Sequence, residues 1–271
     1  MDKNTLQKYD VAGPRYTSYP TAPQWSHDVT GEEYALALKA FGQNDKTLSL
    51  YIHIPFCEQL CYFCACNKVI RPKDNKVGDE FLNYLFREID LVAGLIQRRK
   101  LIRQLHLGGG TPTYLSEAQI EKLFLKIQSV FDIDLDEEIA IEIDPRTVTQ
   151  NKLKVLRKLG FNRVSLGVQD FDTKVQDDIN RIQPYEQVAQ VHQWCRELKF
   201  TSINYDLIYG LPYQTRDTFK KTVDLVVGLR PDRIALYSFA YVPWLSKPQN
   251  KFNLEAIAMH DEKIGYFYSI P

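Results

Sequence analysis

Four of the five cysteines lie within ten residues of each other, at Cys57, Cys61, Cys64 and Cys66. Three thiolates at spacings of four and three residues can hold one face of a cubane iron–sulfur cluster and leave one iron free to bind a small molecule. Cys57, Cys61 and Cys64 are therefore the predicted ligands of a [4Fe-4S] cluster. Cys66 follows so closely that in a tight turn its side chain points elsewhere, and we expect it near a substrate cavity without binding iron. The alternative is a zinc site made from all four cysteines, although zinc sites usually join two separated pairs.

A glycine-rich segment, Gly108–Pro112, follows the second predicted strand. Without side chains the backbone can approach a ligand closely, and its amides and carbonyls can bind an amino or carboxylate group. The segment lacks the Gly-Lys-Ser/Thr ending of a phosphate-binding loop and does not match a dinucleotide fingerprint. A plain turn is the alternative to a ligand-binding loop.

One carboxylate interrupts an apolar strand pattern: Glu142, in residues 139–143. Burying it costs several kcal/mol unless a partner satisfies it. Two interpretations stay open at this point, an ordinary salt bridge to Arg146 or Arg163 and a contact with a ligand.

Three further polar residues come at strand ends or in the loops that follow, namely Gln169, Arg181 and Asp206. Each of them alone could be a helix cap or part of a surface ion pair. Together, a neutral amide, a cation and a carboxylate at one edge of a sheet suit a zwitterionic ligand that carries a ribose.

Short apolar runs alternate with longer amphipathic stretches along most of the chain, a pattern that predicts an α/β fold with a parallel sheet. The predicted strands span residues 48–54, 105–108, 139–143, 163–166, 202–207 and 233–239. Helices are predicted at residues 31–41, 79–99, 116–131, 149–159, 185–198, 216–229 and 254–268. Periodicity leaves open whether the sheet is doubly wound or an arc of a barrel, but both place ligands at the carboxyl ends of the strands.

The composition is that of an ordinary globular protein. Among 271 residues, 34 basic and 34 acidic residues balance to a formal net charge of zero, which disfavours broad binding to nucleic acid. The first ten residues are polar, unlike a signal peptide, and the longest nearly apolar run, residues 234–244, is too short for a membrane span. We therefore expect a soluble, cytoplasmic protein whose crowded cysteines bind a metal and form no disulfides.

The cysteine triplet resembles the signature of a known superfamily. Cys57-x3-Cys61-x2-Cys64, with the aromatic Phe63 before the last cysteine, is similar to the motif of radical S-adenosylmethionine (radical SAM) enzymes. That resemblance implies that the open iron binds the amino and carboxylate groups of S-adenosylmethionine. It also implies that one electron from the cluster cleaves the sulfonium to a 5′-deoxyadenosyl radical.

A narrower resemblance covers nearly the whole chain. The motifs that carry it are Gly13–Ala22, Tyr51–Cys57, Cys66, Gly167–Phe171 and Asp206–Pro212. They resemble the oxygen-independent coproporphyrinogen III oxidase family, which implies a partial (β/α)6 barrel, two S-adenosylmethionine molecules and oxidative decarboxylation of two propionates of coproporphyrinogen III to vinyl groups in haem synthesis.

The resemblance also implies roles for individual residues. The first S-adenosylmethionine would be contacted by Tyr51, Gly109 and Glu142. The second, or the cavity beside it, would involve Phe63, Gly110, Thr111, Gln169, Arg181, Asp206 and Ala240. No catalytic residue is assigned beyond these.

Three segments are expected: an arm and helix at residues 1–47, the barrel at 48–245, and the start of a shortened C-terminal region at 246–271. The family normally continues into a further C-terminal domain, so we expect that domain to be missing. In the arm, Arg15, Tyr16 and Tyr19 are candidate substrate contacts, because a guanidinium can bind a propionate and tyrosines offer flat apolar faces. The alternative is an arm that packs under the barrel as a plug.

The resemblance implies a tetrapyrrole substrate together with an electron donor and an electron acceptor that the sequence does not identify. A monomer is expected. Two rival hypotheses remain, a related radical SAM protein that binds or transfers haem, and an inactive remnant.

Overall fold

The computed structural model describes residues 28–257, together with residues 5, 8, 21, 24–26 and 266. Six parallel strands form one sheet in the order β1-β4-β5-β6-β7-β8. The strands are β1 (Leu48–Ile54), β4 (Leu101–Gly109), β5 (Asp132–Ile143), β6 (Arg163–Gln169), β7 (Ser202–Tyr209) and β8 (Arg233–Ser238). A second, two-stranded sheet pairs β2 (Phe56–Cys57) with β3 (Val69–Ile70).

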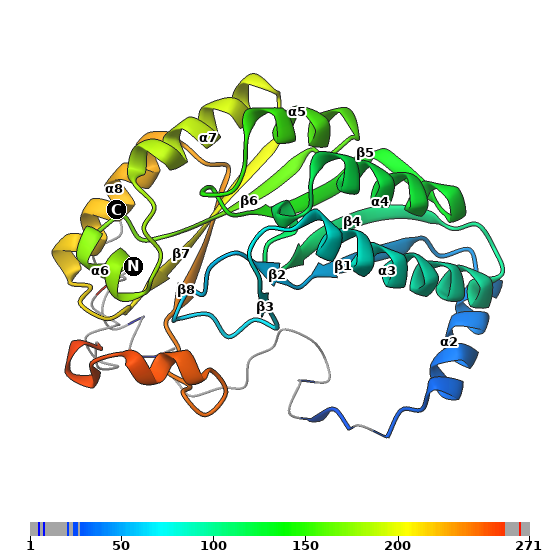
Figure 1. Cartoon of the computed structure of the whole chain (residues 1–271), viewed down its shortest axis with the longest axis horizontal. Coiled ribbons are helices and arrows are strands. Elements are labelled where there is room, and N and C mark those ends of the chain that lie inside the picture. Colours follow the sequence, from blue (N-terminus) through cyan, green and yellow to red (C-terminus); the bar gives the residue numbers. More distant parts are fainter. Residues whose placement is uncertain are drawn as a thin grey trace.

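The curvature and the strand order of the large sheet decide whether it is doubly wound or an arc of a barrel. Its spatial order follows the chain order, whereas a doubly wound sheet reverses direction at a switch point. The sheet bends into an arch with the helices α3, α4, α5, α7 and α8 on its outer side, and β1 and β8 are its two edge strands (Figure 1). The predicted α/β fold with a partial (β/α)6 barrel is confirmed.

The helices agree with the predicted positions apart from details of their ends. They are α2 (Gly31–Gln43), α3 (Asn75–Ile96), α4 (Glu117–Val130), α5 (Gln150–Lys158), α6 (Thr173–Asp178), α7 (Tyr185–Glu197) and α8 (Arg216–Leu229), with 3₁₀ turns η2 (Pro112–Tyr114), η3 (Lys247–Lys251) and η4 (Leu254–Ala256). The short α6 was not predicted. Of the helix predicted at residues 254–268, the described part is the 3₁₀ turn η4 followed by Ile257, and most of the remainder lies outside the described residues.

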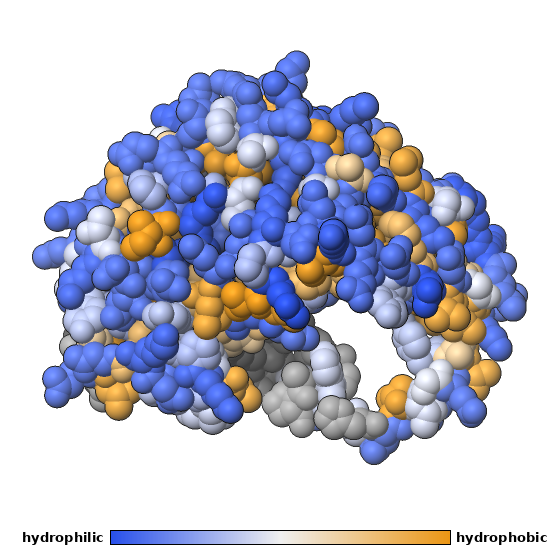
Figure 2. All heavy atoms as spheres, in the orientation of Figure 1, coloured by the Kyte–Doolittle hydropathy of each residue, from blue (hydrophilic) through white to orange (hydrophobic). Residues whose placement is uncertain are grey.

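Alternation along the strands separates an apolar outer layer from a polar inner face. Ile141, Val164 and Ile203 are buried against the helices. Their chain neighbours on the other face, Glu142 and Ser165, are paired in register, and Ser165 is paired in turn with Asn204. The outer helices present mainly hydrophilic atoms to solvent (Figure 2). Hydrophobic burial therefore shapes the arch, and its concave side is left free to carry polar chemistry.

No helix among the described residues combines the length and the apolar character needed to cross a bilayer.

Candidate functional site

A pocket of about 490 Å³ opens at the carboxyl ends of the strands, where a ligand is expected for both a doubly wound sheet and a barrel arc. The predicted residues that line it are Cys57, Cys61, Phe63, Cys64, Gly109, Gly110, Thr111, Glu142, Gln169, Arg181 and Asp206. Tyr51 and Ala240 are not among the lining residues. Arg15, Tyr16 and Tyr19 lie outside the described residues, so their role as substrate contacts stays a prediction.

The cysteines are carried by the loop between β2 and β3. Cys57 ends β2, and its sulfur lies 3.4 Å from the Oγ1 of Thr111 in the glycine-rich segment. The amide of Cys64 donates to the carbonyl of Cys61 in a tight turn (3.1 Å). The Lys68 ammonium donates to the carbonyls of Cys64 (3.0 Å) and Cys66 (3.3 Å). The loop is thus bent over the pocket, with its thiols on one wall.

The donor set fits a cluster better than a single ion. Among the described residues, no three histidine, cysteine or carboxylate side chains lie close enough to share one metal ion. A cubane does not require that convergence, because each cysteine ligates a different iron. A hydrogen bond with Cys66 outweighs burial and, with Lys68 nearby, lowers the pKa of Cys64 to about 6. Burial raises the pKa of Cys57 despite its bond to Thr111, so binding iron there must displace a proton.

Cys66 lies on the exposed side of the loop and also lines the pocket. Its hydrogen bond with Cys64 raises its pKa, so Cys64 ionises first. That it binds no iron stays a prediction.

The glycine-rich segment approaches its neighbours too closely for any side chain. A Cβ on Gly110 would lie 2.6 Å from the carbonyl oxygen of Pro55, and one on Gly108 would lie 2.8 Å from Glu142 Oε1. Gly109 has a φ of +124°, which few other residues adopt. These glycines let the backbone form the pocket wall, as a ligand-binding loop requires.

The structure resolves the partners of Glu142. Arg146 pairs with Asp144, and Arg163 pairs with Glu138, so the salt-bridge interpretation of Glu142 is wrong. Glu142 instead accepts a hydrogen bond from the amide of Gly109 (3.1 Å) and lies 3.3 Å from His106 Nε2. Its side chain is 41% exposed and lines the pocket, and no lysine or arginine among the described residues pairs with it, which leaves it available to a cationic ligand group.

Asp206 and Gln169 lie on the wall of the pocket that β6 and β7 form. Asp206 accepts from Ser165 (3.0 Å) and Asn204 (2.8 Å), and burial raises the pKa of its carboxyl despite these bonds. Gln169 adopts a φ of +67°, a left-handed conformation that is costly for a residue with a side chain. Such strain is common in ligand sites, and here it ends β6 at the pocket.

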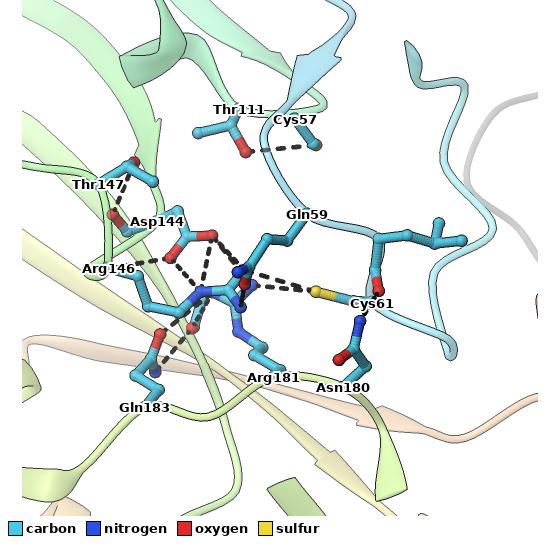
Figure 3. A network of polar contacts seen from close by, with 12 residues as sticks. Cys57, Gln59, Cys61, Thr111, Asp144, Arg146, Thr147, Asn180, Arg181 and Gln183 are labelled. Carbon is cyan, nitrogen blue, oxygen red and sulfur yellow. Dashed lines mark hydrogen bonds and ion pairs between the residues drawn. The ribbon is translucent and has the colours of Figure 1, made fainter. Parts of the chain in front are cut away.

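Arg181 joins this wall to the cysteine loop through Asp144, a residue that the sequence did not single out. Arg181 Nη1 lies 3.2 Å from Asp144 and 3.4 Å from the sulfur of Cys61. Arg146 contacts the same carboxylate and the same sulfur (Figure 3). Burial opposes ionisation of Asp144, but the two arginines outweigh it and lower its pKa to about 2.

The comparisons with known proteins come from the sequence and from the fold. A family model described as "Radical SAM superfamily" matches residues 51–226, which is more than half of the chain and includes all three predicted cluster ligands. The chain belongs to the radical SAM superfamily. Radical SAM enzymes use a [4Fe-4S] cluster and S-adenosylmethionine.

This radical SAM chain is also similar to proteins of narrower description. It is 43% identical over 97% of its length to "Oxygen-independent coproporphyrinogen III oxidase" of Pseudomonas aeruginosa and 45% identical over 92% to the Escherichia coli protein of that name, and it covers 57% and 54% of them. The solved structure of coproporphyrinogen III oxidase (HemN) from Escherichia coli matches with a TM-score of 0.89 and 40% identity over 98% of this chain and 59% of that one. The chain therefore spans little more than half the length of these relatives.

The radical SAM site has a support that sequence reasoning missed, the segment that follows β8. The buried amide of Gln249 donates to the carbonyls of Phe63 (3.1 Å) and Ala240 (3.2 Å) and accepts from the amide of Val242 (2.6 Å). Ser246 donates to the carbonyl of Cys64 (3.0 Å). Phe63 and Ala240, both predicted near the second cofactor molecule, are thus linked by one side chain.

Gln249→Ala is expected to weaken the hold on the cysteine loop, because two carbonyls and one amide lose their shared partner. A buried polar group left without a partner costs about 1–3 kcal/mol. We expect a lower melting temperature and faster loss of iron from the reconstituted protein, measured by thermal unfolding and by iron release to a chelator. Gln193→Ala, in an exposed pair with Glu197, is the matched control. Iron release at the wild-type rate would contradict this role.

Proposed function

We propose that this radical SAM chain acts as an oxygen-independent coproporphyrinogen III oxidase, an oxidoreductase of haem biosynthesis. The reaction converts two propionate side chains of coproporphyrinogen III to vinyl groups and gives protoporphyrinogen IX. The observation that carries the proposal is the extent of the similarity. The match to the Pseudomonas aeruginosa oxidase covers 97% of the chain, whereas the superfamily model matches residues 51–226 alone.

The proposed site assigns the cluster to Cys57, Cys61 and Cys64. When bound there, the cluster and S-adenosylmethionine supply a 5′-deoxyadenosyl radical that can remove a hydrogen atom from the β-carbon of a propionate. Loss of carbon dioxide and of one electron to an acceptor then leaves the vinyl group. The donor that reduces the cluster and the final acceptor are further partners, each identified here only by this electron transfer.

The pocket residues have distinct tasks in this proposal. Glu142 is partly exposed and pairs with no lysine or arginine of the described part of the chain, and it accepts a cationic amino group. The backbone of Gly109 and Gly110 allows the close approach of the ligand. Tyr51, on β1 and outside the pocket lining, has its ring stacked on His106 (5.7 Å between centroids) and is proposed to contact the first S-adenosylmethionine. Enclosing the reactants in this way keeps water out and holds the target carbon near the radical.

A second cofactor molecule is part of the proposal. Its contacts would come from the cysteine loop, the glycine-rich segment, the wall that β6 and β7 form, and the segment after β8. The residues are Phe63, Gly110, Thr111, Gln169, Arg181, Asp206 and Ala240. Arg181 and Asp206 present opposite charges across this wall, which suits a ligand that is both zwitterionic and ribose-bearing. Arg15, Tyr16 and Tyr19 are proposed to bind the propionates of the tetrapyrrole. We also propose that the protein acts in the cytoplasm, because cytoplasmic thiols stay reduced and able to bind iron. A monomer is proposed as its oligomeric state.

An anaerobic assay tests the proposal. The reconstituted chain is given a strong reductant, S-adenosylmethionine and coproporphyrinogen III, and vinyl products and 5′-deoxyadenosine are measured together. We expect both from the wild type and neither from Cys61→Ala. 5′-Deoxyadenosine without vinyl products would contradict the substrate assignment, and tight binding of haem in its place would favour the haem-transfer hypothesis.

A further inference from the structure

Two arginines donate to the sulfur of one predicted cluster ligand. Arg146 Nη2 lies 3.6 Å and Arg181 Nη1 lies 3.4 Å from Cys61 Sγ. The sulfur belongs to a buried residue, and both guanidinium groups approach it from the inner side of the loop (Figure 3). Hydrogen bonds to a cluster's sulfurs are among the determinants of its reduction potential.

Arg146 is held in this position by most of its donors. Its Nε and Nη2 bind the carboxylate of Asp144 (Nη2 to Oδ2, 2.7 Å), and Nη1 binds Gln59 Oε1 (3.2 Å). Only 14% of its side chain and 8% of the Asp144 side chain are exposed. Because its guanidinium group is bound on both sides, the contact between Arg146 and the sulfur of Cys61 is held in place.

The charges of this group do not cancel. Arg146 and Arg181 contribute two positive charges and Asp144 one negative charge, so a net charge of about +1 stands beside Cys61 in a region that is poorly screened by water. A positive charge favours whichever state of a neighbouring cluster is more negative, and that is the reduced state. Both arginines line the pocket. Arg181 is a proposed cofactor contact, whereas Nε, Nη1 and Nη2 of Arg146 all donate to protein groups.

We propose that Arg146 is a positioning residue that acts through Cys61 to raise the reduction potential of the cluster. The inference rests on the proposed ligation of iron by Cys61. Reduction adds one electron to the cluster from a low-potential donor, and Arg146 keeps its proton throughout, so its effect is purely electrostatic. As a consequence, a moderately strong electron donor can reduce the cluster.

The test is a redox titration of the reconstituted, full 271-residue chain with dithionite as the electron source, followed by the spectroscopic signal of the reduced cluster. We expect Arg146→Gln to lower the ratio of reduced to oxidised cluster at a fixed potential about tenfold, which is about 59 mV for a one-electron couple. Arg146→Lys, which keeps the charge and loses the fork, should fall between this variant and the wild type.

The control is Arg196→Gln. Arg196 forms an ion pair of the same kind with Asp232, next to the amino ends of β7 and β8 and thus at the opposite end of the sheet from the pocket. The cluster of the Arg196→Gln variant should have the same reduction potential as that of the wild type.

The outcomes are separable. A wild-type potential in Arg146→Gln with full iron content overturns the proposal. If Arg146→Gln holds no cluster, the reduction potential of Arg146→Lys decides in the same way. Loss of the cluster from both variants also overturns the proposal, because the role of Arg146 would then be to retain the cluster and not to set its reduction potential. Failure of the wild type to bind a cluster would refute the proposed ligand set before any variant is compared.

Discussion

Each of the substitutions Cys57→Ala, Cys61→Ala and Cys64→Ala is expected to remove most of the iron and sulfide from anaerobically reconstituted protein. In the proposed cubane each cysteine holds a different iron, so loss of one leaves a second iron exposed and the cluster open to dissolution. Iron and sulfide in near-equal amounts, with the cluster's visible absorption, are the measurements for the wild type. Stoichiometric zinc in their place would refute the assignment.

Cys66→Ser is the matched control, because it alters a thiol two positions along the same loop. We expect it to keep the iron content and absorption of the wild type, whatever happens to turnover. A loss of iron equal to that of Cys64→Ala would show that Cys66 is a ligand.

Glu142→Gln is expected to weaken binding of S-adenosylmethionine at least tenfold while changing the melting temperature little. The substitution keeps the shape of the side chain and removes its charge, and the side chain is 41% exposed, so the fold depends on it weakly. Anaerobic calorimetric titration measures the affinity, and thermal unfolding measures the stability.

Glu138→Gln is the control for this experiment. Glu138 lies on the same strand and the same face, four residues earlier, but it pairs with Arg163 and does not line the pocket. We expect it to bind the cofactor as the wild type does. A large fall in melting temperature for Glu142→Gln, with unchanged affinity, would contradict the cofactor role.

The sheet could be predicted because its strands are buried on the outer face. Runs such as residues 202–207 are rich in apolar residues wherever helices cover them, and these appear in the structure with small shifts of their ends. The first half of β5 could not be predicted, since Asp132–Glu138 is largely acidic and partly exposed and carries no apolar run. The six-residue α6 is too short for a periodicity and depends on the Asp172 cap.

The site could be predicted where chemistry is local in the sequence. The cysteine triplet and the glycine run can each be recognised in the sequence by their spacing, and Cys57, Cys61, Cys64, Gly109 and Gly110 line the pocket. Asp144 and Gln249 could not be recognised, because the contacts that tie them to the pocket are made with distant residues, apart from the pairing of Asp144 with Arg146 two residues away. Asp144 meets Arg181 across 37 positions, and Gln249 meets Phe63 across 186. Tyr237, which also lines the pocket, looked like an ordinary strand residue.

The support of the cysteine loop by the segment after β8 has a consequence for biosynthesis. Ser246 and Gln249 contact Cys64 and Phe63 across 182 and 186 positions, so the loop cannot take its final shape while the ribosome is still making the barrel. Its thiols are expected to remain accessible throughout that time, and insertion of iron then follows the synthesis of this segment. Stalled nascent chains that end before residue 246 should accordingly be alkylated at these cysteines faster than the 271-residue apoprotein, and equal rates would refute this order of events.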